Sequence, residues 1–64
     1  MKVGEIWVGR EHAHADNFKV KITELYVDPF GRDVVKALDL YRGPFMFHRE
    51  MFIKMFKRDY NESW

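Results

Sequence analysis

Residues 45–56 read Phe-Met-Phe-His-Arg-Glu-Met-Phe-Ile-Lys-Met-Phe, and this stretch decides the fold. It holds four of the six phenylalanines and three of the four methionines of a 64-residue chain. Large apolar side chains contribute most of the free energy gained by burial. The stretch must therefore lie at the centre of the core, and we expect the other segments to be strands that cover it.

The second half of the stretch has the periodicity of an amphipathic helix. At about 100° per residue, the apolar side chains fall in one stripe: Met51, Phe52, Met55 and Phe56. The charged side chains fall on the opposite side: Glu50, Lys54, Lys57 and Arg58. Glu50 and Lys54 have the spacing of a surface ion pair. A longer stripe would bury His48 at one end or Asp59 at the other, so we expect a helix near residues 48–58.

The first half of the stretch has the period of a strand. Two phenylalanine rings flank Met46, so both rings point to one face. A Gly-Pro pair at 43–44 breaks the chain before this strand. The alternative is one longer helix over residues 44–58, with Pro44 in its first turn. The sequence leaves both structures open.

The segment Asp28-Pro29-Phe30-Gly31-Arg32 predicts a three-residue hairpin loop with Gly31 in the left-handed conformation. If Asp28 lies opposite Arg32, apolar residues face apolar residues and opposite charges face each other. The predicted pairs are Val20 with Leu40, Ile22 with Leu38, Glu24 with Lys36, Lys21 with Asp39, Leu25 with Val35 and Thr23 with Ala37. The apolar pairs near Val20 lie on one face of the predicted hairpin, and the pair of Leu25 and Val35 lies on the other. A strongly twisted hairpin can accommodate this change when its two halves belong to two packed sheets.

The whole chain predicts one mainly β domain with one short α-helix. We expect a first strand from Glu5 to about His14, a turn at Asp16-Asn17 and a last strand near Tyr60. The domain covers residues 1–60, and residues 61–64 are expected to form a mobile tail.

The run Val3-Gly4-Glu5-Ile6-Trp7, two long strands, and Phe52 and Phe56 on a short helix resemble small SH3-like β-barrel proteins. Many of these proteins are uncharacterised products of bacteriophages and prophages. The resemblance implies a barrel of about four to five antiparallel strands. It also implies binding to proteins or nucleic acids rather than catalysis, and it carries no functional residue with it.

Composition narrows the classes of function. The chain has no cysteine, so it has neither a disulfide nor a thiolate metal site. Its net charge is +1 with the two signs finely mixed, whereas a dedicated polyanion binder shows one basic face. No apolar run exceeds three residues, so nothing spans a membrane. The first residues lack the apolar core of a signal peptide, and we expect a cytoplasmic protein.

Catalytic and metal-binding patterns are weak. The chain has no cysteine, its one serine is Ser63 in the tail, and its glycines are isolated, so we expect no enzyme and no cofactor. His12 and His14 lie two apart, so their imidazoles would point the same way on a strand. A zinc site would need a third ligand such as Asp16 or His48, and exposed polar strand residues are the simpler interpretation.

Surface aromatic residues favour protein binding. A core this small cannot bury every ring, and rings left at the surface are typical hot spots of an interface. We expect a non-catalytic module of phage type that docks on a host or viral protein through Trp7, Phe30 and Tyr41, and a homodimer is a further expectation for these rings. The alternative is a nucleic-acid-binding barrel, which would use the cationic side chains Lys19, Lys21, Lys54, Lys57 and Arg58.

Overall fold

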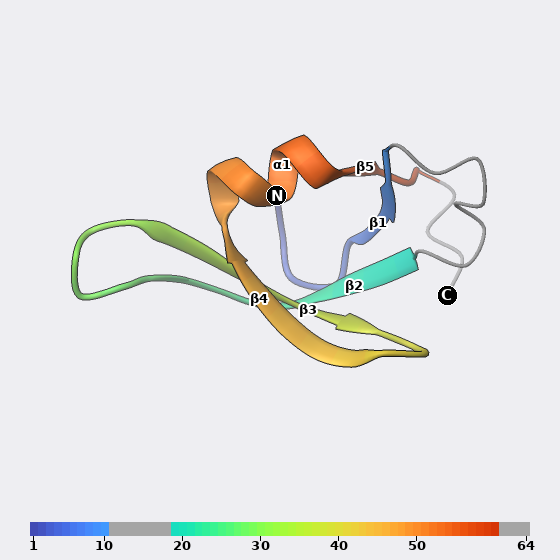
Figure 1. Ribbon diagram of the computed structural model, residues 1–64, viewed down its shortest axis with the longest axis horizontal. Coiled ribbons are helices and arrows are strands. Elements are labelled where there is room, and N and C mark those ends of the chain that lie inside the picture. Colours follow the sequence, from blue (N-terminus) through green and yellow to red (C-terminus); the bar gives the residue numbers. More distant parts are fainter. Residues whose placement is uncertain (11–18, 61–64) are drawn as a thin grey trace.

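The structure, a computed structural model, describes residues 1–10 and 19–60. This part of the chain forms one five-stranded antiparallel sheet, in the order β4-β3-β2-β1-β5, and one short helix (Figure 1). The prediction of a mainly β domain with one helix is confirmed. The elements are β1 (Ile6–Gly9), β2 (Lys19–Val27), β3 (Asp33–Asp39), β4 (Gly43–His48), α1 (Arg49–Met55) and β5 (Phe56–Arg58).

The core lies between the sheet and α1. In Figure 1, α1 lies above β2, β3 and β4, and the β2–β3 turn projects away on the left. Phe52 of α1 is fully buried against Val20, Ile22, Val35 and Ala37. The edge strands β4 and β5 are not paired with each other in the described residues, but the rings at their edges stack. A continuous chain of ring contacts links β1, α1, β5 and β4: Trp7, Phe52, Phe56, Phe45 and Phe47.

The helix is shorter than the sequence predicts. It ends at Met55, and Phe56–Arg58 is extended and pairs with β1. The N–H of Phe56 still donates to the Phe52 carbonyl, which closes the last helical turn. Because β5 pairs with β1, the backbone N–H and C=O groups along that edge of β1 have hydrogen-bond partners. Buried backbone groups require such partners. The predicted strand near Tyr60 therefore comes earlier, and Lys57 and Arg58 lie on β5 instead of the helix.

The alternative of one helix over residues 44–58 is wrong. Residues 43–48 form β4, and His48 is extended, with φ −63° and ψ 146°. Two side-chain predictions for α1 are also corrected. Met51 and Met55 are exposed at the rim instead of buried with Phe52. Glu50 forms its ion pair with Arg32, at 3.6 Å, because the hairpin loop lies beside the first turn of α1.

The β2–β3 register is confirmed near the turn and wrong beyond Glu24. Glu24 faces Lys36 and Leu25 faces Val35 as predicted, but a β-bulge between Ile22 and Glu24 shifts the remaining pairs by one. The observed partners are Ile22 with Ala37, Lys21 with Leu38 and Val20 with Asp39. The bulge adds one residue to β2 and so moves the following side chains to the other face. Val20, Ile22 and Leu25 consequently share the core face, which resolves the change of face seen in the sequence.

The first strand is shorter in the described residues than predicted. β1 ends at Gly9, and the predicted continuation to His14, the turn at Asp16-Asn17 and the tail 61–64 lie outside the described residues. Gly4 has a φ of 96°, as expected of a turn before the strand. Within the described part of the chain, the helix is too short and too polar to cross a membrane.

Replacing Phe52 with Ala should lower the free energy of unfolding by about 3–5 kcal/mol, because the ring is fully buried and its loss leaves a cavity. The matched control is Phe30→Ala, which removes the same ring from an exposed position and should change the stability little. Urea unfolding of both variants tests this. Equal stabilities would contradict the assignment of Phe52 to the core.

Replacing Gly31 with Val should cost about 1 kcal/mol or more, because Gly31 has a φ of 83° and a branched side chain resists that conformation. No heavy atom lies within 4 Å of the added Cβ, so the cost arises in the backbone. Gly31→Asn should cost less, since Asn tolerates positive φ. Thermal unfolding of the two variants measures the difference, and a Val variant as stable as the Asn variant would refute this loop conformation.

Candidate protein-binding groove

One edge of β4 pairs with no other strand of the described residues, and this edge borders an apolar hollow. The hollow has a volume of about 490 Å³, and methionines from two elements line it: Met46 of β4, and Met51 and Met55 of α1. These side chains are 55%, 47% and 38% exposed. The remaining lining residues are Tyr26, Asp28, Val34, Phe47 and His48.

The hollow extends over both faces of β4. Phe47 lies opposite Val35 and therefore points to the core face, while Met46 lies opposite Lys36 and points to the outer face. Both side chains line the same hollow. It therefore lies around the edge of the strand instead of on one face of the sheet.

The packing of α1 determines where its methionines lie. Phe52 points into the core and fixes the rotation of the helix. Met51 and Met55 are four residues apart and so lie on one side of the helix, and both line the hollow next to β4. Apolar side chains at this position meet β4 at its edge, where no further strand of the described residues covers them.

A second hollow of about 230 Å³ continues along the strand toward its beginning. It shares Phe47 and Met55 with the first and is lined further by Asp39, Arg42, Gly43, Pro44, Phe45 and Phe56. The two hollows form one groove along β4, which we call the β4 groove.

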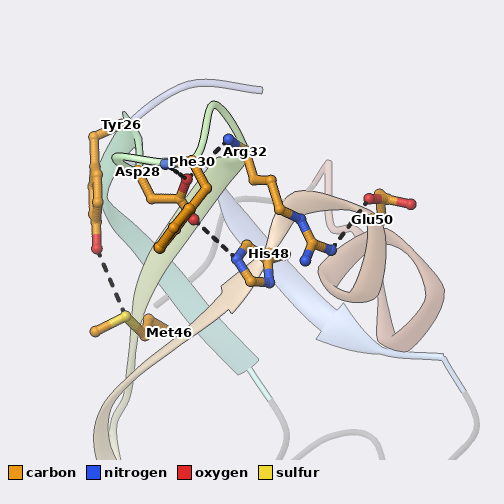
Figure 2. A network of polar contacts seen from close by, with 7 residues as sticks. All are labelled: Tyr26, Asp28, Phe30, Arg32, Met46, His48 and Glu50. Atoms are coloured by element: carbon orange, nitrogen blue, oxygen red, sulfur yellow. Dashed lines mark hydrogen bonds and ion pairs between the residues drawn. The ribbon is translucent and has the colours of Figure 1, made fainter.

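Asp28 anchors one end of the β4 groove (Figure 2). One carboxylate oxygen accepts the backbone N–H groups of Phe30 and Arg32, each at 2.9 Å, and the other lies 3.2 Å from Nε2 of His48. The N–H of Arg32, followed by His48 and the N–H of Phe30, lowers the pKa of Asp28 below its ordinary value. The hairpin loop is thereby attached to the end of β4.

Two further contacts hold the same end of the groove (Figure 2). Arg32 pairs with Glu50 of α1 at 3.6 Å, and the Tyr26 hydroxyl donates to Sδ of Met46 at 3.7 Å. An exposed ion pair contributes little free energy, so the main effect of the pair between Arg32 and Glu50 is to place the hairpin loop beside α1.

Asp39 anchors the other end. Its side chain is buried, and it accepts the backbone N–H groups of Tyr41 and Arg42 at 2.8 and 3.0 Å. The Arg42 guanidinium lies 3.0 Å from the second oxygen. Burial alone would raise the pKa of Asp39, but these N–H groups and the guanidinium together lower it below its ordinary value. The predicted pairing of Asp39 with Lys21 is wrong, because Asp39 holds the β3–β4 turn instead.

The three predicted aromatic binding residues do not form one surface. Trp7 packs edge-on against Phe52, with ring centroids 5.2 Å apart, and its indole N–H donates to Glu5. Phe30 and Tyr41 are 88% and 75% exposed, but they lie in the turns at opposite ends of β3. Phe30 lies in the loop that Asp28 anchors and Tyr41 in the turn that Asp39 anchors, at opposite ends of the β4 groove, and none of the three rings lines it.

The five predicted cations lie on three elements, β2, α1 and β5, and two of them form ion pairs with acidic residues of the described part of the chain. Lys19 pairs with Asp59 at 3.3 Å, and Arg58 pairs with Glu5 at 3.4 Å. Lys54 lies on α1, while Lys21 and Lys57 are exposed on β2 and β5. Lys19 and Lys57 flank Val8 across adjacent strands.

The candidate metal ligands His12, His14 and Asp16 lie outside the described residues. The remaining candidate, His48, contacts Asp28. Within residues 1–10 and 19–60, no three His, Asp or Glu side chains gather at a spacing that holds a metal ion.

Comparison of the chain with models of protein families, with curated proteins and with solved structures found no match in any of the three. The geometry of the β4 groove is therefore the basis for a function.

Acid should destabilise the protein partly through Asp39. A lowered folded-state pKa means that the folded state binds fewer protons than the unfolded state. The stabilisation is present above the ordinary pKa of 3.8 and is lost as the pH falls through the lower folded pKa. Urea unfolding at pH values from about 6 down to about 2 should show this loss in the wild type. Asp39→Asn should be less stable near neutral pH and show a smaller loss in acid, and parallel curves for the two proteins would contradict the role of Asp39.

Proposed function

We propose that the protein is a non-catalytic protein-binding module and that the β4 groove is its binding surface. The observation that carries the proposal is the group of three exposed methionines around the edge of β4. Exposed apolar groups that gather in one place are typical of interaction sites. Methionine is flexible and polarizable, so surfaces rich in methionine adapt to the side chains of a partner.

The arrangement of the groove supports recognition of a protein. The rings beneath it are held in the core by neighbouring rings, with Phe45 5.9 Å and Phe52 4.8 Å from Phe56. The methionines above them are exposed. A rigid base with adaptable side chains at its rim lowers the entropy lost on binding. Phe30 extends the apolar surface beyond the Asp28 end of the groove.

We also propose that the protein is one of the small SH3-like barrels. The order of its elements supports this: four strands form a meander, and a short helix leads to a fifth strand that returns to β1. Such small barrels commonly bind macromolecules, and many come from bacteriophages and prophages. We propose on this basis a phage-type accessory protein that acts in the cytoplasm and docks on a host or viral protein.

The alternative is binding to nucleic acid. The observation that favours it is the position of Lys19 and Lys57 on either side of Val8, with Lys21 further along β2. Salt distinguishes the two functions, because contacts with phosphate weaken steeply as the salt concentration rises and apolar contacts do not.

Changing Met51 and Met55 together to Glu should abolish capture of the protein partner from a nuclease-treated bacterial lysate. Charges in a desolvated apolar contact are costly, and loss of hot-spot residues weakens binding about tenfold or more. The matched control is Val3→Glu, which changes an exposed apolar residue outside the groove.

A second variant tests the alternative: Lys21 and Lys57 both changed to Gln. Circular dichroism first confirms that each variant is folded. We expect the lysine variant and the Val3 variant to capture the same partner as the wild type at low and at high salt. Retained capture by the methionine variant, or binding of single-stranded DNA that the lysine variant loses, would contradict the proposed function.

A further inference from the structure

We propose that Met51 and Met55 form a reversible oxidation site, at which hydrogen peroxide converts both thioethers to sulfoxides and thereby prevents the β4 groove from binding its protein partner. This inference rests on the proposed function and adds a regulation of the same groove. Methionine sulfoxide is polar, and its formation disrupts interfaces that are rich in methionine.

The first argument is access to the two sulfur atoms. A peroxide must reach a thioether to oxidise it, so oxidation follows exposure. Met51 and Met55 are exposed at the rim of the β4 groove, whereas Phe52 between them is fully buried. The two methionines are four residues apart and lie on one side of α1. The same small oxidant therefore reaches both of them from the groove.

The second argument is the environment of the third groove methionine. Met46 is the most exposed of the three, but its Sδ accepts a hydrogen bond from the Tyr26 hydroxyl at 3.7 Å (Figure 2). The Lys36 ammonium lies 5.9 Å from the centroid of the Tyr26 ring and helps to hold it in place. A sulfur lone pair that accepts a hydrogen bond is less available to attack a peroxide. We therefore expect Met46 to react more slowly than Met51, although exposure alone gives the opposite order.

Each oxidation consumes one hydrogen peroxide. A lone pair of the methionine sulfur attacks one peroxide oxygen, so an S–O bond forms and the O–O bond breaks. The sulfur loses two electrons and the peroxide gains them, and the departing hydroxide takes the proton of the transferred oxygen to form water. Methionine sulfoxide reductases restore the thioether. In that step a dithiol is oxidised to a disulfide, and the sulfoxide oxygen leaves as water.

The third argument is the effect of the sulfoxides on the groove. An apolar contact with Met51 and Met55 would bury each sulfoxide oxygen among apolar groups, and burial of a polar group without a hydrogen bond costs free energy. The base of the groove does not change, because Phe52 and Phe56 are buried and contain no sulfur. Oxidation therefore weakens binding while the fold stays intact.

The rates of oxidation are measured first, on the isolated protein. Hydrogen peroxide is added, and the sulfoxide at each methionine is followed by NMR of the methyl groups and by mass spectrometry of peptides. We expect Met51 and Met55 to be oxidised before Met46. Tyr26→Phe should accelerate the oxidation of Met46 about threefold or more, the factor that one hydrogen bond supplies, and leave the rate of Met51 unchanged. Oxidation of Met46 before Met51, or an unchanged rate of Met46 in Tyr26→Phe, would overturn the inference.

Binding is measured next, with the partner purified from the lysate. The protein is treated with hydrogen peroxide, catalase removes the excess, and the partner is then added. We expect the affinity to fall about tenfold or more and to recover after incubation with a methionine sulfoxide reductase and dithiothreitol. The matched control changes both Met51 and Met55 to Leu, which is apolar and of similar volume. This leucine variant should bind the partner equally well before and after peroxide.

Circular dichroism shows whether the treated proteins are folded. The inference is overturned if the oxidised wild type binds as tightly as the untreated protein, if peroxide unfolds it, or if peroxide weakens the leucine variant to the same extent. In each of these cases the proposed function stands, provided that the variant with Glu at both positions has lost the partner. If that glutamate variant keeps the partner, the proposed function itself fails.

Discussion

The stacked pair Phe52 and Phe56 is the interaction on which the structure depends. Their centroids lie 4.8 Å apart, and both rings are buried. A domain of this size buries little surface and usually needs a disulfide or a metal in addition. The chain has no cysteine, so ring packing must supply the missing stabilisation. Phe52 lies on α1 and Phe56 on β5, so their contact joins the helix to the sheet.

The same rings explain why one edge of β4 pairs with no strand in the part of the chain that the structure describes. Phe56 begins β5 and stacks on Phe45 of β4, so the two edges of the sheet approach each other through side chains instead of hydrogen bonds. The short helix between them fills the remaining space with Phe52 and leaves Met51 and Met55 at the rim. The groove is thus a consequence of how the core closes.

The sequence predicted the parts of the fold that depend on local chemistry. Gly31 adopts positive φ, the pairs next to the loop have the expected register, and Phe52 is buried. It did not predict features that depend on distant neighbours. The bulge after Ile22 arises because both halves of β2 must face one core, and the helix ends at Met55 because the edge of β1 requires a strand. The groove was missed because a helical wheel places Met51 and Met55 in the apolar stripe without showing how much of that stripe the sheet covers. The available signal was the uncharged run at residues 43–47, because edge strands are usually protected by charged side chains.

The most direct test of the account is an NMR titration of protein labelled at the methionine methyl groups, with the purified lysate partner as the titrant. Four methionines report on two regions: Met46, Met51 and Met55 line the β4 groove, and Met1 packs against the core outside it. We expect the resonances of the three groove methionines to shift together on binding, while that of Met1 stays unchanged. A partner that binds without shifting the three resonances, or that shifts only Met1, would contradict the claim that the β4 groove is the binding surface.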